Sequence, residues 1–196
     1  AIKQSEFLLC DYNGAKMFRN AMRNDPNSDK IYMPYMVFEA GWSGQSFMQA
    51  RHYIDEYIRN GNKYYLDTAL SCLDAWMESQ LESGLFPINY RRHVTKEYLP
   101  CDVCNFAWAA AEAVKAYKKL NSIGIERDRY LEFARRICDF FVANYDSRTG
   151  FGLKWTVYGE KVADGGSIGG FMIMAMLEIY KATNDKKYLE CAITAM

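Results

Sequence analysis

The feature that most constrains the fold is a five-residue phrase that occurs three times. It reads YLDTA at residues 65–69, YLEFA at 130–134 and YLECA at 188–192. In each case another helix-like segment ending in tyrosine precedes the phrase. The polar turn between the two is short in the first and third units and longer in the middle unit, at residues 121–129. Each unit is therefore predicted to be a helical hairpin, with a period near sixty residues, longer than the ~34 residues of tetratricopeptide arrays.

The two helices of a hairpin differ in character. The first ones, residues 106–117 and 168–180, are apolar on nearly every face, which predicts burial on every face. The second ones, residues 65–80 and 130–144, carry a single apolar stripe and a charged opposite face. One fully buried and one half-buried helix per repeat predicts two layers, an inner and an outer one. The predicted fold class is all-α, an α/α toroid.

Long connections lead from each outer helix to the next inner helix, at residues 24–41, 84–102 and 150–164. Loops of this length are usually functional or disordered, and their aromatic content argues against disorder. Residues 151–158 alternate in a way that favours a short β-ribbon. We also expect a helix around residues 7–22.

The toroid is expected to be incomplete. About three hairpins fit into residues 1–196, which we interpret as one domain and a fragment of a longer toroid. Three hairpins leave apolar faces uncovered at both ends of the array. We expect further hairpins of the same chain, or another subunit, to cover the open edge.

Composition excludes several classes of function. Lys+Arg and Asp+Glu balance at 24 each, so no surplus of positive charge points to nucleic acid. No apolar run reaches the ~20 residues that span a bilayer, so no membrane partner is expected. The six cysteines fall mostly in apolar stripes, and Cys101 and Cys104 lack the second pair of ligands that a structural zinc site needs. We expect no metal and no cofactor.

The pattern resembles the six-hairpin glycosidase superfamily, the (α/α)6 toroids. The resemblance rests on the hairpin architecture and on phrases such as GWSGQS at residues 41–46 and DGGS at 164–167. It implies a glycoside hydrolase, a polysaccharide lyase or a sugar epimerase, with the active site where the inner helices begin. A complete toroid of this kind is roughly twice as long as this chain. The resemblance alone points to the bacterial periplasm or to secretion, and the sequence itself leaves the compartment open.

Each long connection ends in an acid just before an inner helix: Glu39, Asp102 and Asp164. The repeat therefore places three carboxylates on one rim. Glycoside hydrolysis commonly uses two carboxyl groups, one as acid and one as base or nucleophile. The alternative for Asp102 and Asp164 is a purely structural role, because aspartate is a common helix N-cap.

Aromatic side chains in or beside the same connections are candidates for stacking on sugar rings, or alternatively for anchoring the loops. These are Trp42, Tyr90, Tyr98, Trp155 and Tyr158. By contrast, Trp76 and Trp108 stand at helical spacing and are expected in the core.

Polar side chains near the inner-helix starts complete the predicted site. The amides of Gln45 and Asn105 are candidates for binding sugar hydroxyls, or for satisfying helix ends. Arg92, between Arg91 and His93, would suit an acidic sugar, or simply belong to a solvated loop.

Three functions follow from these patterns. The leading one is a carbohydrate-active protein, a glycoside hydrolase or part of one, with proton transfer by one or two of the three rim acids. The second is a non-catalytic helical module that binds glycan or protein. The third is a sugar epimerase or polysaccharide lyase, for which Tyr90, His93 and Tyr98 are the candidate catalytic groups.

Overall fold

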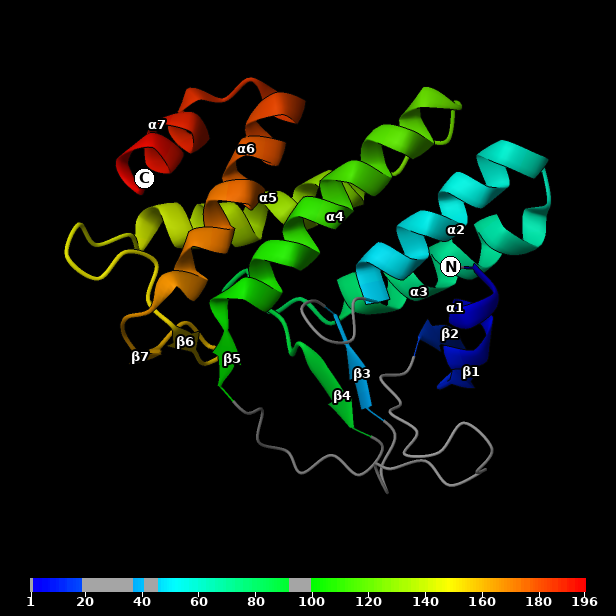
Figure 1. Ribbon diagram of the computed structural model, residues 1–196, viewed down its shortest axis with the longest axis horizontal. Helices are drawn as coiled ribbons and strands as arrows, with labels where there is room; N and C mark the ends of the chain where they lie inside the picture. The colour runs from blue at the N-terminus through cyan, green and yellow to red at the C-terminus, as the bar shows by residue number, and fades with distance from the viewer. Residues whose placement is uncertain (1, 19–36, 41–45, 92–99) are drawn as a thin grey trace.

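The structure is a computed structural model that describes residues 2–18, 37–40, 46–91 and 100–196. Three helical hairpins follow one another in it (Figure 1). Their helices are α2 (Ser46–Asn60) with α3 (Lys63–Glu78), α4 (Val103–Ser122) with α5 (Asp128–Ala143), and α6 (Phe171–Thr183) with α7 (Lys186–Thr194). The predicted all-α hairpin array is confirmed.

The hairpins form two layers. The first helices, α2, α4 and α6, neighbour one another, with α4 in contact with both of the others. The second helices, α3, α5 and α7, also contact one another in order. In Figure 1 the inner helices run in the same direction, and all three begin on the side where the short strands β3 to β7 lie. The predicted inner and outer layers are therefore confirmed.

The central inner helix, α4, is buried on most of its surface. Twelve of its 20 residues are buried, and five of these are alanines between Ala107 and Ala113. Small side chains let the flanking helices approach closely. The outer helix α5 instead buries a single stripe, including Phe133, Ile137 and Phe141. These two burial patterns follow from the two hydrophobic patterns in the sequence.

The turns of the first and third hairpins are closed by N-caps. The Asn62 side chain accepts a hydrogen bond from the Tyr64 amide, and Asp185 accepts one from the Lys187 amide. Such caps satisfy amide groups that a helix start otherwise leaves unpaired.

Aromatic rings fill the space between the layers and fix the long connections. Phe86, in the connection after α3, lies with its ring centroid 5.1 Å from that of Phe133 and 5.7 Å from that of Phe106. The Phe86 side chain is fully buried. It therefore ties the connection to both an outer and an inner helix.

The outer helices are joined by a contact that repeats along the array. The Tyr130 hydroxyl donates to Asp74 on α3 at 2.7 Å, and the Tyr188 hydroxyl donates to Asp139 on α5 at 2.7 Å. Each tyrosine opens one of the repeated phrases, and each aspartate lies nine residues after the tyrosine of the preceding phrase. The repeated sequence therefore specifies the hairpins and also the Tyr–Asp hydrogen bond that joins one outer helix to the next.

The expected helix over residues 7–22 is wrong. A short helix α1 (Ile2–Leu8) leads directly into strands β1 (Leu9–Tyr12) and β2 (Ala15–Phe18), which pair antiparallel. Asn13 and Gly14 between them both have positive φ, 49° and 81°. An Asn-Gly pair is the preferred two-residue hairpin turn, and this local signal prevails over the apolar pattern. Residues 19–22 lie outside the described part.

Short strands gather where the inner helices begin (Figure 1). Strand β3 (Val37–Glu39) pairs with β4 (Asn89–Arg91). Strand β6 (Lys154–Trp155) lies between β5 (Cys101–Asp102) and β7 (Lys161–Ala163). The predicted β-ribbon over residues 151–158 is confirmed, with β7 and β5 as its partners. A 3-10 turn, η1 (Ser167–Gly170), then leads into α6.

A charge network joins α2 to α4. Glu112 on α4 is only 2% exposed, and its carboxylate accepts from Arg51 on α2 and from Lys115 at 2.8 Å. Arg51 also donates to Asp55 at 2.9 Å and to the ring nitrogen Nε2 of His52 at 3.0 Å. A buried carboxylate needs such partners, so this network sets how the two inner helices pair.

Replacing Arg51 by methionine is expected to destabilise the fold. The variant leaves Glu112 buried with one cation fewer, which should lower the free energy of unfolding by about 3 kcal/mol. The matched control is Arg59→Met on the same helix, because Arg59 is 69% exposed and pairs with Glu56 at the surface. Urea unfolding measures both variants. Equal, small effects of the two would contradict the role of the network.

Stability is expected to depend on the protonation of His52. Burial, and then the adjacent Arg51 charge, lower the pKa of His52 below its ordinary value of 6.5. The unfolded chain therefore binds this proton more readily, and the free energy of unfolding should fall as pH drops below 6.5. Urea unfolding of wild type and His52→Gln across this range measures the effect. The variant should show a shallower pH dependence, and an unchanged slope would refute the assignment.

Candidate functional site

The candidate site is the rim formed by the starts of the inner helices and the two small sheets beside them. Strand β5 runs directly into α4, so that Asp102 is the last strand residue and also the residue before the helix. Its partner in the sheet is Lys154 on β6, which in turn pairs with Ala163 on β7. The sheet therefore fixes the backbone of Asp102 at the mouth of the inner layer.

Asp102 occupies the N-cap position of α4 but makes no capping hydrogen bond. Its Oδ1 atom is buried without a hydrogen-bond partner among the described residues. The nearest cation is the ammonium group of Lys154, at 3.7 Å from Oδ1. Asn62 and Asp185, by comparison, do bond helix amides. Asp102 therefore stands at the helix start, where the helix dipole favours its charge, but it makes no capping hydrogen bond.

Asp164 is held differently. Its carboxylate pairs with Lys161 at 2.8 Å, and two glycines separate it from η1, so it caps no helix. Lys161 lies opposite Trp155 on β6, whereas Lys154, the next residue of that strand, lies opposite Asp102. A register shift interrupts the β6–β7 pairing between Lys154 and Trp155. The two aspartates are paired with different lysines, Asp102 with Lys154 and Asp164 with Lys161.

Part of the predicted site is described only by its backbone or not at all. Glu39 ends β3 opposite Asn89, and Tyr90 lies in β4 opposite Phe38, which places both backbones at the rim. The side chains of Glu39 and Tyr90 are outside the described part. The same holds for four whole residues of the predicted site: Trp42, Gln45, Arg92 and Tyr98.

The structure supports the anchoring alternative for Trp155. This side chain is 4% exposed, and its indole N–H donates to the Phe151 carbonyl at 2.8 Å. Its ring packs edge-on against Phe140 and Phe141, with centroids 5.1 Å and 5.9 Å away. A ring buried in this way does not offer a face to a sugar. Tyr158, between β6 and β7, is instead 66% exposed.

Two residues of α4 follow Asp102 on the inner layer. Asn105, a predicted binding residue, lies in the first turn and is partly exposed. Trp108, expected in the core, is also only partly buried, whereas Trp76 is fully buried as expected. The spacing of three residues from Asp102 to Asn105 and from Asn105 to Trp108 is the signal that could have placed Trp108 beside the site.

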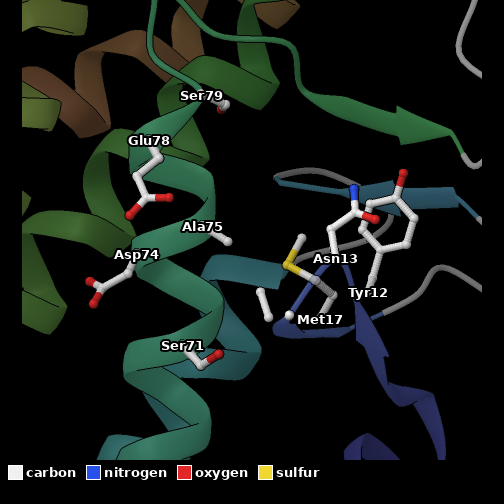
Figure 2. A pocket seen from close by; sticks show the side chains of 10 residues that line it. Tyr12, Asn13, Met17, Ser71, Asp74, Ala75, Glu78 and Ser79 are labelled. Atoms are coloured by element: carbon white, nitrogen blue, oxygen red, sulfur yellow. The ribbon is translucent and has the colours of Figure 1, made fainter.

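A pocket of about 430 Å³ lies elsewhere, between the β1–β2 hairpin and α3. Figure 2 shows Tyr12, Asn13 and Met17 facing Ser71 and Ala75 across it, with Asp74 and Glu78 directed away from Tyr12. The Ser71 hydroxyl already accepts from the Lys16 amide at 2.9 Å. Because α3 belongs to the outer layer, this pocket is not part of the rim.

The thiols give no sign of reactive chemistry. All six cysteines are free. Burial raises the pKa of both Cys101 and Cys104 to about 11, so these thiols stay protonated at neutral pH. In the described ranges no three His, Cys, Asp or Glu side chains cluster in a way that could hold a metal ion. Nor does any helix there have the length and apolar character needed to cross a membrane.

Comparisons of the sequence with protein-family models and with curated proteins give no match. Solved structures do match. The GH76 alpha-mannanase of Bacteroides thetaiotaomicron has a TM-score of 0.65 and 21% identity, over 99% of this chain and 51% of its own. A sugar epimerase from a ruminal bacterium gives 0.68 and 16%, over 98% and 49%. The unsaturated glucuronyl hydrolase of Bacillus sp. GL1 gives 0.59 and 12%, over 89% and 47%.

These likenesses establish the fold. The chain has the hairpin architecture of an α/α toroid, as the sequence predicts, and it spans about half the length of the similar structures.

Replacing Trp155 by phenylalanine is expected to loosen the rim. The variant loses a buried hydrogen bond and leaves the Phe151 carbonyl without its donor, which should lower the free energy of unfolding by about 1–3 kcal/mol. Tyr158→Phe, at the exposed turn of the same ribbon, is the control and should have little effect. Chemical denaturation measures both. A Trp155→Phe variant as stable as wild type would contradict the anchoring role.

Proposed function

We propose that this chain is a carbohydrate-active protein, a glycoside hydrolase or part of one. The observation that carries the proposal is Asp102, a rim carboxylate with a buried oxygen that neither caps its helix nor accepts any hydrogen bond from the described residues. An oxygen placed in this way is available to accept a hydrogen bond from a water or from a bound ligand. The likeness to sugar-processing enzymes of the same fold supports this choice of substrate class.

In this proposal Asp102 is one member of the catalytic pair. Facing the ammonium group of Lys154, it serves as the ionised member, either the nucleophile or the base that activates water. The second carboxyl group must stand roughly 5–10 Å away and protonate the leaving oxygen. Glu39 is our first choice for it, because its backbone ends the neighbouring rim strand. Asp164 is the second choice, since it would first have to leave Lys161.

The other half of the cleft is proposed to come from outside these three hairpins. The similar structures are about twice as long as this chain. At the α7 edge Ile193 is 57% exposed and Met196 is 81% exposed, which suits an apolar contact. Further hairpins of the same polypeptide, or a second subunit, would cover this edge and supply the remaining rim groups.

Two other functions remain as alternatives. The separate lysine partners of Asp102 and Asp164 favour a non-catalytic glycan-binding module, which needs no converging pair of acids. The likeness to a sugar epimerase favours isomerisation of a free sugar. Tyr90, His93 and Tyr98 remain the candidates for that chemistry or for a lyase.

Replacing Asp102 by asparagine should abolish glycan hydrolysis. The substitution keeps the shape and removes the charge, so release of reducing ends from α-mannan and a glycan panel should fall by about 10²–10⁴-fold. The assay uses this chain alone and the full product of its gene. Asp128→Asn, at the exposed start of α5, is the matched control and should keep full activity.

The alternatives predict other outcomes. A binding module would bind a glycan and release no reducing ends. An epimerase would interconvert free D-mannose and a second sugar, which chromatography of the reaction mixture detects. Full hydrolytic activity in Asp102→Asn would refute the assigned role.

A further inference from the structure

One side of α4 faces away from the outer helices, and Trp108 lies on that side. Phe106 is fully buried, and its ring centroid lies 5.9 Å from that of Phe141 on the outer helix α5. Trp108 follows two residues later, and at about 100° per residue it projects roughly 200° away from Phe106. Since α2 and α6 flank α4 and α5 lies behind it, Trp108 points to the side that faces away from the outer layer.

Asn105 and Glu112 lie on the same side and form a stripe with Trp108, three residues before and four residues after it. Both Asn105 and Trp108 are partly exposed, although most of α4 around them is buried. The part of this stripe from Asn105 to Trp108, one turn inside the rim at Asp102, is therefore partly open, whereas Glu112 at its deep end is buried.

The environment of Trp108 is the opposite of that of Trp155. The Trp155 indole N–H is anchored to a carbonyl and its ring is buried. The Nε1 atom of Trp108 is buried and has no hydrogen-bond partner among the described residues. Because that atom is inaccessible, the exposed part of the Trp108 side chain is hydrocarbon. An open apolar ring surface is what the C–H face of a pyranose binds.

Phe171 extends this surface onto the next inner helix. It is the first residue of α6, it is partly exposed, and its ring centroid lies 6.3 Å from that of Trp108 at an interplanar angle of 38°. Two rings from two inner helices thus meet on the inner face, close to where α4 and α6 begin.

The charged groups deeper on this face already have partners. Glu112 is neutralised by Arg51 and Lys115, and Asp55 pairs with Arg51 and Lys119. These three cations and two carboxylates are all engaged in ion pairs, and the stripe next to Trp108 itself offers hydrocarbon and the amide of Asn105. That combination suits a neutral sugar ring with hydroxyl groups better than a uronate.

We propose that Trp108 and Phe171 form an aromatic platform that binds one neutral pyranose ring of the substrate, with Asn105 bonding its hydroxyls. The inference rests on the proposed function and specifies its substrate class. Trp108 lies six residues beyond Asp102, about 9 Å along the helix axis. The platform therefore holds the sugar next to the one whose anomeric carbon lies at Asp102.

Titration calorimetry with an α-linked manno-oligosaccharide tests the platform, and an oligogalacturonate serves as the acidic counterpart. Trp108→Ala should weaken binding of the neutral oligosaccharide by tenfold or more, whereas Trp108→Phe, which keeps a smaller ring, should weaken it about threefold. Tyr64→Ala is the control, because Tyr64 is an exposed aromatic residue of the outer helix α3 and should not affect binding. Thermal unfolding of each variant shows that it is folded. If Trp108→Ala does not fold, Trp108→Phe decides the test.

The outcomes separate the platform from the proposed hydrolase. Binding that depends on Trp108 without any hydrolysis would support the platform and refute the hydrolase. Hydrolysis that is lost in Asp102→Asn but unchanged in both Trp108 variants would support the hydrolase and refute the platform. Tighter binding of oligogalacturonate than of the manno-oligosaccharide would overturn the assignment to neutral sugars. No binding of either oligosaccharide would overturn the platform.

Discussion

The burial of α4 on almost all sides is the constraint on which the rest of the structure depends. A helix can be enclosed by two inner neighbours and one outer helix only if its side chains let them approach, and the alanines of α4 do so. The enclosure leaves one stripe of the helix open. It also brings Glu112 into the interior, where only the cations of α2 and α4 make its charge tolerable. The alanine packing and the buried charge network thus both determine how α2 and α4 lie against each other.

The position of Asp102 at the rim follows from the way strand β5 leads into α4. Strand β5 passes into the helix without a loop, and Asp102 belongs to both elements. The sheet bonds of β5 and β6 hold this backbone while Phe86 and Trp155 anchor the two connections in the core. The Oδ1 atom of Asp102, which accepts no hydrogen bond from the described residues, is thus held in place by the backbone, which is how binding and catalytic sites generally use a scaffold.

The sequence predicts the periodic parts of the molecule well and the local exceptions poorly. The Tyr65, Tyr130 and Tyr188 phrases locate the hairpins, because burial in two layers imposes a repeated pattern. The β1–β2 hairpin is missed because the Asn13-Gly14 turn outweighs an apolar pattern that also fits a helix. Trp108, expected in the core, is partly exposed, and Trp155, for which sugar contact and anchoring were both open, is buried, for a different reason. Spacing shows that a residue lies on a helix or ribbon, but only the packed neighbours decide whether its face is open or covered.

The same limit applies to the acids. Glu39, Asp102 and Asp164 share a position before an inner helix, yet the structure pairs Asp102 with Lys154 and Asp164 with Lys161. The central claim is that the open stripe of α4 beneath Asp102 is the ligand site. A crystal structure with a bound manno-oligosaccharide tests it most directly. We expect a sugar ring against Trp108, with the saccharide chain leading toward Asp102. A saccharide in the pocket between β1–β2 and α3 (Figure 2), with the α4 stripe empty, would contradict it.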